Sequence, residues 1–174
     1  LTDPIGFGLA ASLVRPGGQV TGILITSDSS AVKTFGLVLE VVPGARKIGV
    51  LVNVGNQSNA VHRRNIEVAA GAFAVELAMG EVRAADDLDA AFQKLGREHV
   101  AFVVATLDGL FVSERRRIVE LAAATRLPAL YPYREQFEVG GLMSYGVDLR
   151  ASWRQTATFV DKILKGAKAA DLRN

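Results

Sequence analysis

The sequence predicts an α/β fold with a doubly wound parallel sheet, on three observations. Strand-length apolar runs at residues 47–53, 76–82 and 99–106 alternate with helical patterns. The run at 47–53 is apolar at nearly every position, which is typical of a parallel strand covered by helices on both faces. The predicted strands start roughly 25–30 residues apart, the length of a βαβ unit. Right-handed crossovers between such units give a doubly wound sheet.

The chain before residue 43 contains three expected elements. A helix is expected at 4–14, because Asp3 can cap it and Pro4 lies at its first position, where the missing N–H is harmless. Residues 19–26 are rich in β-branched and apolar side chains and predict a strand. A helix at 29–42 follows, because apolar residues recur on one of its faces: Val32, Phe35, Leu39 and Val42.

From residue 47 strands and helices alternate regularly. Apolar periodicity predicts a strand at 47–53, a helix at 60–73, a strand at 76–82, a helix at 86–96, a strand at 99–106, a helix at 113–125 and a strand at 127–131. Asp86 and Ser113 are the expected N-caps of the last two helices, and residues 107–110 are expected to form a loop.

The final third departs from this alternation. A short helix at 134–139, a flexible joint at Gly140-Gly141 and a short strand at 142–145 are expected before a long helix at 148–165. The long helix carries an apolar stripe formed by Trp153, Ala157, Val160 and Leu164. Because an amphipathic helix buries its apolar face, this helix either covers the sheet or belongs to a second lobe.

Composition excludes several classes of protein. The chain has 174 residues, 49% of them hydrophobic and 22% charged, which indicates a folded domain rather than a disordered segment. The net charge is +2 without a basic stripe, so no nucleic-acid partner is expected. The absence of cysteine excludes thiol catalysis and Cys-based zinc sites. No apolar run approaches the ~18 residues that span a bilayer, and the first residues lack the regions of a signal peptide.

Candidate site residues follow from the expected topology. In open α/β sheets a ligand lies beyond the carboxyl ends of the strands, at a topological switch point. The polar and aromatic residues expected there are Asn53, Asn56, Thr106, Asp108, Tyr131, Arg134, Ser144 and Tyr145. They are hydrogen-bonding and aromatic groups rather than a catalytic set, and turn formation or capping explains a polar loop residue about equally well.

Enzyme hypotheses find little support in the sequence. His99 begins a strand and so lies at the wrong end of the sheet, and His62 at a helix start is expected to be solvated. Neither a Gly-x-Ser-x-Gly elbow nor a phosphate-binding P-loop is present. The acidic run at 86–89 is better explained by helix capping than by metal binding. No catalytic residue, metal or cofactor is therefore expected.

Several stretches resemble the periplasmic substrate-binding proteins of a bacterial ABC-importer family, whose better-understood members are linked to tryptophan and other aromatic amino acids. The resemblance covers the whole chain and rests on five motifs in order: Asp3-Pro4-Ile5-Gly6, Ala11-Ser12-Leu13-Val14-Arg15-Pro16-Gly17-Gly18-Gln19-Val20-Thr21-Gly22, Tyr131-Pro132-Tyr133-Arg134-Glu135, Gly140-Gly141-Leu142-Met143-Ser144-Tyr145-Gly146 and Val160-Asp161-Lys162-Ile163-Leu164-Lys165-Gly166-Ala167-Lys168.

The resemblance implies a type I periplasmic-binding-protein fold with two lobes. Residues 1–25 would end the first lobe and form the crossover, 26–140 would form the second lobe, and 141–174 would supply a hinge strand and a helix that returns to the first lobe. The chain would then be a C-terminal lobe fragment. Its exposed apolar faces, on 4–14 and 148–165, predict a homodimer of the fragment.

The resemblance also assigns roles to the strand-end residues. It implies amide contacts from Asn53 and Asn56, a carboxylate for a ligand amino group from Asp108, aromatic faces from Tyr131 and Tyr145, and a partner for a ligand carboxylate from Arg134. Asp3 and Ser144 would lie near the hinge crossing, with Gly140-Gly141 and Gly146 as pivots.

The function implied is that of a solute-binding component of an ABC-type importer. It would capture a small molecule, such as an aromatic amino acid or a related acid, without chemistry, and deliver it to a membrane permease. The periplasm is the location implied. Two alternatives keep the fold and change the class: the effector-binding core of a two-lobe transcription repressor, and an enzyme of flavodoxin-like or Rossmann type.

Overall fold

A computed structural model of the chain describes residues 4–12, 17–24 and 28–172. The chain divides into two compact units. The sheet unit comprises Ser27–Val147, and the terminal unit comprises Leu1–Thr26 together with Asp148–Asn174.

The sheet unit is built on a five-stranded sheet whose neighbouring strands all pair in parallel. Its strands are β1 (Lys47–Asn53), β2 (Glu76–Val82), β3 (Phe102–Ala105), β4 (Ala129–Tyr133) and β5 (Met143–Val147). Their order across the sheet is β2-β1-β3-β4-β5, so the chain winds first to one side of β1 and then to the other. The prediction of a doubly wound parallel sheet is confirmed.

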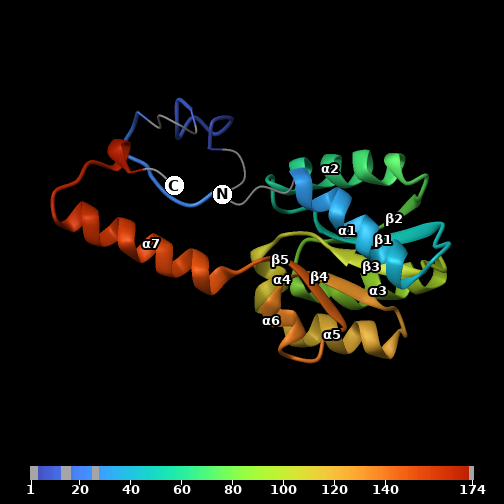
Figure 1. Ribbon diagram of the computed structural model, residues 1–174. Helices are drawn as coiled ribbons and strands as arrows, with labels where there is room; N and C mark the ends of the chain where they lie inside the picture. Colours follow the sequence, from blue (N-terminus) through green and yellow to red (C-terminus); the bar gives the residue numbers. More distant parts are fainter. Residues whose placement is uncertain (1–3, 13–16, 25–27, 173–174) are drawn as a thin grey trace. The chain divides into compact units, whose positions relative to one another are not determined.

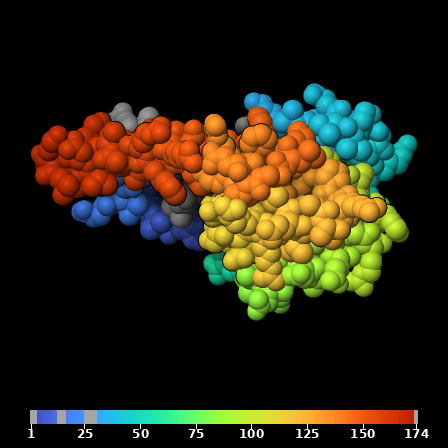
Figure 2. Space-filling view, turned by 90° about the horizontal axis from the view of Figure 1, so that it is seen from below, coloured from blue at the N-terminus to red at the C-terminus, as the bar shows by residue number. Residues whose placement is uncertain are grey.

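Helices cover both faces of this sheet (Figure 1). The sheet unit contains α1 (Asp28–Val41), α2 (Asn59–Ala72), the 3-10 turn η1 (Ala85–Asp87), α3 (Leu88–Arg97), α4 (Gly109–Ser113), α5 (Arg115–Ala124) and α6 (Arg134–Phe137). Helices α1 and α2 pack on one face, and α3 and α5 pack on the other. Figure 2 shows residues of α3 to α6, coloured yellow-green to orange, closing the second of these faces.

Strand β1 shows why the sequence signal is so regular. Ile48, Val50 and Val52 point into the core under α1 and α2, whereas Leu51 points into the core under α3 and α5. Because side chains alternate along a strand, a strand buried on both faces needs apolar residues at every position. The predicted bounds of β1 and β2 match the structure residue for residue.

Several elements of the sheet unit differ from the expectation. Strand β3 begins at Phe102 rather than at residue 99, and β5 ends at Val147 rather than at residue 145. Instead of a loop at 107–110 and a helix at 113–125, the chain forms α4 and α5, because the Asp108 side chain accepts a hydrogen bond from Leu110 N and so caps a helix that begins at Gly109. Strand β4 runs to Tyr133, two residues past its expected end. Asp87, rather than Asp86, accepts backbone hydrogen bonds at the start of the next helical segment, from the amides of residues 83 and 84.

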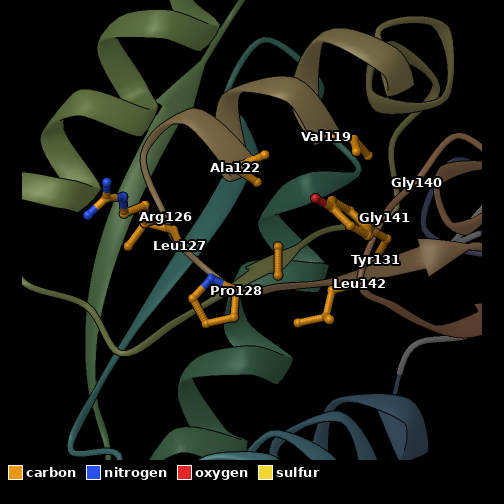
Figure 3. A pocket seen from close by; sticks show the side chains of 11 residues that line it. Val119, Ala122, Arg126, Leu127, Pro128, Tyr131, Gly140, Gly141 and Leu142 are labelled. Atoms are coloured by element: carbon orange, nitrogen blue, oxygen red, sulfur yellow. The ribbon is translucent and has the colours of Figure 1, made fainter.

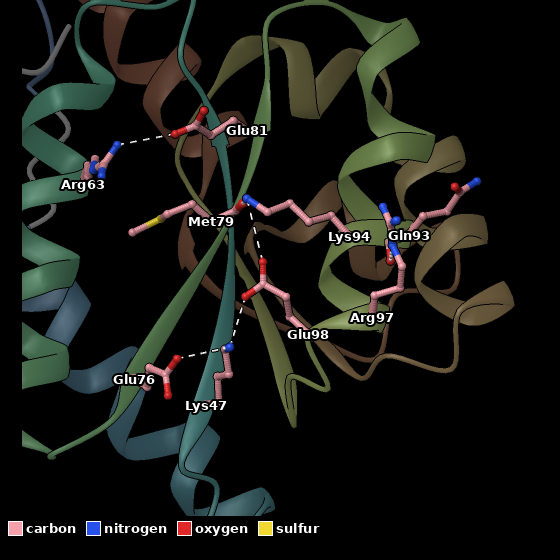
Figure 4. A network of polar contacts seen from close by, with 9 residues as sticks. All are labelled: Lys47, Arg63, Glu76, Met79, Glu81, Gln93, Lys94, Arg97 and Glu98. Carbon is pink, nitrogen blue, oxygen red and sulfur yellow. Dashed lines mark hydrogen bonds and ion pairs between the residues drawn. The ribbon is translucent and has the colours of Figure 1, made fainter.

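Charged side chains pair near the amino-terminal ends of β1 and β2 (Figure 4). Lys47 Nζ lies 3.1 Å from a carboxylate oxygen of Glu76 and 3.1 Å from one of Glu98. These two partners raise the pKa of Lys47 above its ordinary value. Lys94 Nζ donates a 2.8 Å hydrogen bond to the carbonyl oxygen of Met79 on β2, which is an edge strand. The lysine therefore covers part of the exposed edge.

His62 on α2 differs from the expectation of a solvated histidine. The structure buries it, with 4% of its surface exposed. The side chain lies on the inner face of α2 together with Ile66 and Ala69, because residues three and four apart share a helix face.

In the terminal unit, two predicted elements are wrong over the residues that the structure describes. Residues 4–12 form turns rather than a helix: the amides of Leu9 and Ala10 both donate to Pro4 O, and Gly8 adopts a φ of +68°. Residues 19–24 form no strand. A strand needs a paired neighbour for its backbone groups, and no described residue of this unit belongs to another strand.

The long C-terminal helix of the terminal unit is present as α7 (Leu149–Leu164), followed by the 3-10 turn η2 (Ala169–Asp171). Asp148 caps α7 as expected, because its carboxylate accepts from Ala151 N at 2.9 Å. Phe159 is the buried residue of this helix, whereas Trp153 and Leu164 are exposed. Within the described ranges, no helix combines the length and the apolar character needed to cross a bilayer.

Candidate functional site

The sheet topology creates one place where strand-end loops diverge. Strand β1 lies between β2 and β3, so the loop after β1 and the loop after β3 lead to helices on opposite faces of the sheet. Open α/β sheets bind their ligands at such a switch point, outside the carboxyl ends of the strands. Asn53 ends β1, and Thr106 follows β3 directly.

The carboxylate of Asp108 lies at this switch point and accepts four hydrogen bonds. Its Oδ1 accepts from Asn53 Nδ2 at 3.0 Å and from Leu110 N at 2.9 Å. Its Oδ2 accepts from Asn56 Nδ2 at 2.7 Å and from Asn59 Nδ2 at 2.8 Å. The Asp108 network, defined as Asp108, Asn53, Asn56 and Asn59, thus joins the loop after β1 to the loop after β3.

The asparagines of this network also shape the loop between β1 and α2. Asn53 Oδ1 accepts from Gly55 N at 2.9 Å, and Asn56 Oδ1 accepts from Ser58 N at 3.0 Å. Both are bonds from a backbone N–H two residues ahead, the pattern of an Asx turn. In both asparagines, therefore, the side-chain oxygen bonds the loop backbone and the side-chain nitrogen bonds Asp108.

Burial separates the members of the network. Asp108 and Asn59 are 4% and 2% exposed, and Asn53 is buried beside them, whereas Asn56 is exposed. Thr106 is buried as well, with its hydroxyl donating to Leu51 O at 3.2 Å. Asn56 is therefore the member of the network that is open to solvent.

Sequence reasoning missed Asn59. The residue begins α2, where an asparagine is usually explained as a capping residue, and it follows Asn53 and Asn56 at intervals of three. Three asparagines spaced three residues apart, from the last residue of one strand onward, are the sequence pattern that could have identified it.

The structure does not place Tyr131 at the carboxyl edge. Tyr131 lies in the middle of β4 and is buried against α5. It lines a cavity of about 300 Å³ with Val119, Leu127 and Gly141, among others, and its ring lies between the helix and the Gly140-Gly141 segment (Figure 3). Burial raises the pKa of Tyr131 to about 12.

Tyr133 holds the position that was assigned to Tyr131. It is the last residue of β4 and is largely buried. Its pKa is raised to about 12 by burial first, and then by the negative charges of Asp108 and Glu135. The phenol therefore belongs to the same edge as the Asp108 network. The sequence reasoning missed it because the strand was expected to end two residues earlier.

The remaining predicted residues are distributed around β4 and β5. Arg134 begins α6, is exposed, and pairs through Nε with Glu138 Oε1 at 3.2 Å. Ser144 and Tyr145 are consecutive on β5, so they point to opposite faces, and Tyr145 packs against the core under α1 and α2. Asp3 lies outside the described residues.

These features define the sheet unit as a lobe of the periplasmic-binding-protein type, a doubly wound sheet with polar strand-end loops at its switch point. The chain belongs to the family described as ABC transporter substrate binding protein, which matches residues 1–174.

Individual relatives agree with this assignment. The chain is 26% identical over 174 residues to a tyrosine-binding protein of Clostridioides difficile, covering 99% of this chain and 49% of the relative. A conserved domain protein from Vibrio cholerae superposes with a TM-score of 0.88 at 25% identity, over 99% of this chain and 57% of that one. An ABC domain from Streptococcus pneumonia, solved in complex with L-Trp, has the same fold, with a TM-score of 0.87 at 24% identity over 99% and 57% of the two chains. The chain thus spans about half the length of these relatives.

Proposed function

We propose that this chain belongs to the solute-binding component of an ABC-type importer, which captures an aromatic amino acid or a related acid without chemistry. The observation that carries the proposal is the family match over residues 1–174. The named ligand of the relative from Clostridioides difficile, tyrosine, supports the ligand class. The same match favours a binding protein over the repressor and enzyme alternatives.

The geometry supports two different roles at the proposed site, in which buried residues hold the loops and exposed residues contact the solute. Asn53, Thr106 and Asp108 are buried and hydrogen-bonded within the chain. Asn56, in the loop after β1, and Arg134, at the start of α6 after β4, are exposed. We assign solute contact to these exposed groups and to the half-buried aromatic side chain of Tyr145. Arg134 would pair with a solute carboxylate, because a guanidinium presents parallel N–H donors to two oxygens.

The terminal unit fits the expected role of an element that returns to a first lobe. Its helix α7 exposes apolar side chains, among them Trp153, Val160 and Leu164, and relatives are about twice as long as this chain. In the full natural protein these side chains would pack against the first lobe. In the 174-residue chain alone we expect them to be buried in a homodimer, which sedimentation velocity at micromolar concentration tests; a monomer contradicts it.

Delivery to a membrane permease and a location outside the cytoplasm are parts of the same proposal. They rest on the family to which the chain belongs. A pull-down from membranes with the tagged natural protein, with and without solute, tests the first if permease subunits are identified among the captured proteins. Fractionation of cells that carry the tagged natural protein tests the second.

A titration of the full natural protein with amino acids tests the solute-binding function. Tyrosine or tryptophan should raise the melting temperature and release heat in calorimetry. Arg134→Gln should weaken binding, whereas Arg116→Gln, the same change at an exposed position of α5, should not. If no small solute stabilises the protein and turnover of a substrate is detected, the proposal is wrong.

A further inference from the structure

We propose that Asp108 is a positioning residue of the binding site: its carboxylate fastens the loop after β1 in a fixed shape and does not itself contact the amino group of the solute. The inference rests on the proposed function and revises the role that the family resemblance implied for Asp108. It is carried by the hydrogen bonds of one buried carboxylate.

The first argument is saturation of the acceptor. An ionised carboxylate offers about four lone-pair directions, and Asp108 fills two on each oxygen with donors of its own chain. The side chain is 4% exposed. A solute ammonium group could reach this carboxylate only by displacing one of the donors that hold the loop.

The second argument comes from the origin of the donors. Asn53 ends β1, Asn56 lies in the loop, Asn59 begins α2, and Leu110 lies in the first turn of α4. One carboxylate therefore ties together four backbone segments around the switch point. The loop residues between these anchors, 54–57, are exposed, so their shape depends on the anchors rather than on a covering layer.

The orientation of Asn59 gives a third argument. Its Nδ2 is directed to Asp108 Oδ2 at 2.8 Å, although this leaves its buried Oδ1 without a hydrogen-bond partner in the described structure. A buried polar atom without a partner is unfavourable. Asn59 adopts this orientation because its N–H group bonds a charged acceptor, which forms stronger hydrogen bonds than a neutral one.

Asp108→Asn separates positioning from direct contact. The substitution preserves size and can keep Oδ1, but it places an NH₂ group where Asn56 and Asn59 both direct N–H donors. The double variant Asp108→Asn/Asn59→Asp exchanges donor and acceptor across this pair, which restores one hydrogen bond and the net charge. Asp86→Asn is the matched control, since Asp86 is exposed and carries the same charge.

Two solutes read out the difference in the full natural protein: tyrosine, and 3-(4-hydroxyphenyl)propionic acid, which lacks the amino group. We expect Asp108→Asn to weaken binding of both by the same factor, about tenfold or more, and the double variant to recover part of it for both. A loss confined to tyrosine, with the amine-free acid unaffected, would mean direct contact with the solute ammonium and would overturn the proposal.

Hydrogen exchange tests the positioning role without any solute. In folded Asp108→Asn, with folding verified by thermal unfolding, backbone amides of 54–59 and of Leu110 should exchange about tenfold faster than in the parent and in Asp86→Asn. Unchanged exchange would exclude positioning. If the parent protein bound no amino acid or acid, the proposed function would fail while this experiment still decided the role of Asp108.

Discussion

The side-chain amide of Asn59 donates a 2.8 Å hydrogen bond to Asp108 Oδ2 across a separation of 49 residues. The contact joins the first residue of α2, on one face of the sheet, to the cap of α4, on the other. The residues that line the switch point are thus held by one another.

Asp108→Ala should destabilise the sheet unit. The substitution removes the cap of α4 and leaves the amide groups of buried Asn53 and Asn59 without their acceptor. Unsatisfied buried donors and a lost cap together correspond to about 3 kcal/mol of unfolding free energy. Urea denaturation should show a lower midpoint with an unchanged slope.

Ser58→Ala provides the control for this prediction. Ser58 occupies the N-cap position of α2, but its side chain makes no capping hydrogen bond. Its removal should change the free energy of unfolding by less than about 0.5 kcal/mol. Equal midpoints for the two variants would show that the Asp108 network contributes no stability.

The two buried tyrosines of β4 predict loss of stability at alkaline pH. Their folded-state pKa of about 12 lies above the ordinary value of 10.0. The neutral phenol is therefore favoured by folding, and the contribution is fully present below pH 10 and is lost as the pH rises from 10 to 12. Urea denaturation at pH 9 and pH 12 should differ by about 2 kcal/mol for each tyrosine.

Absorbance at 295 nm identifies the groups responsible. Tyr131→Phe and Tyr133→Phe should each remove one step of phenolate formation near pH 12 and reduce the alkaline loss of stability. If the parent showed every tyrosine ionised by pH 10.5 while still folded, the burial argument would be wrong.

Gly141→Ala should destabilise the segment between α6 and β5. A Cβ at this position would lie 2.7 Å from Gln136 O and 2.8 Å from Tyr131 Cε2. Because one neighbour is backbone and the other is a buried ring, relief requires movement of the core, and we expect a loss of about 2 kcal/mol. The glycine is thus required for a close approach to Gln136 and Tyr131.

Gly109→Ala is the companion to Gly141→Ala. A Cβ at the first residue of α4 meets no atom within 4 Å, and alanine restricts the unfolded chain more than glycine does. The variant should be as stable as the parent or slightly more stable in thermal unfolding. Similar losses for both alanines would indicate that backbone freedom, rather than contact, sets the requirement at 141.

Lys94→Ala should increase self-association through β2. The ammonium group covers the Met79 carbonyl on this edge strand, and charged side chains on an edge oppose pairing with another chain. Light scattering during heating should begin at a lower temperature than for Lys33→Ala, an exposed lysine of α1. Identical onset temperatures for the two variants would show that Lys94 does not oppose association through β2.

Much of the fold was predictable because burial in either core imposes a pattern of apolar residues on the local sequence. A strand buried on two faces is apolar throughout, as in β1, and a helix buried on one face repeats its apolar residues, as in α3 with Leu88, Ala91, Phe92 and Leu95. Of the residues expected at the carboxyl edge, Asn53, Asn56 and Asp108 are joined by hydrogen bonds, whereas Thr106 bonds the backbone of β1 instead. The sequence could not decide whether Tyr131 or Tyr133 ends β4. Moving the end of a strand by two residues leaves the alternation of its side chains between the two faces unchanged.

The sequence by itself determined the order of elements, the two covered faces of the sheet and the edge where polar residues gather, because these depend on periodicity and on strand ends. Only the tertiary structure decided what those residues do there. Whether Asp108 faces a solute or its own chain depends on donors such as Asn59, which lies 49 residues away along the chain, and no local pattern encodes which groups meet across such a separation. The terminal unit gives a second example. Its described residues form neither the helix expected over 4–14 nor the strand expected over 19–26, because a local apolar pattern does not by itself fix the shape of a segment.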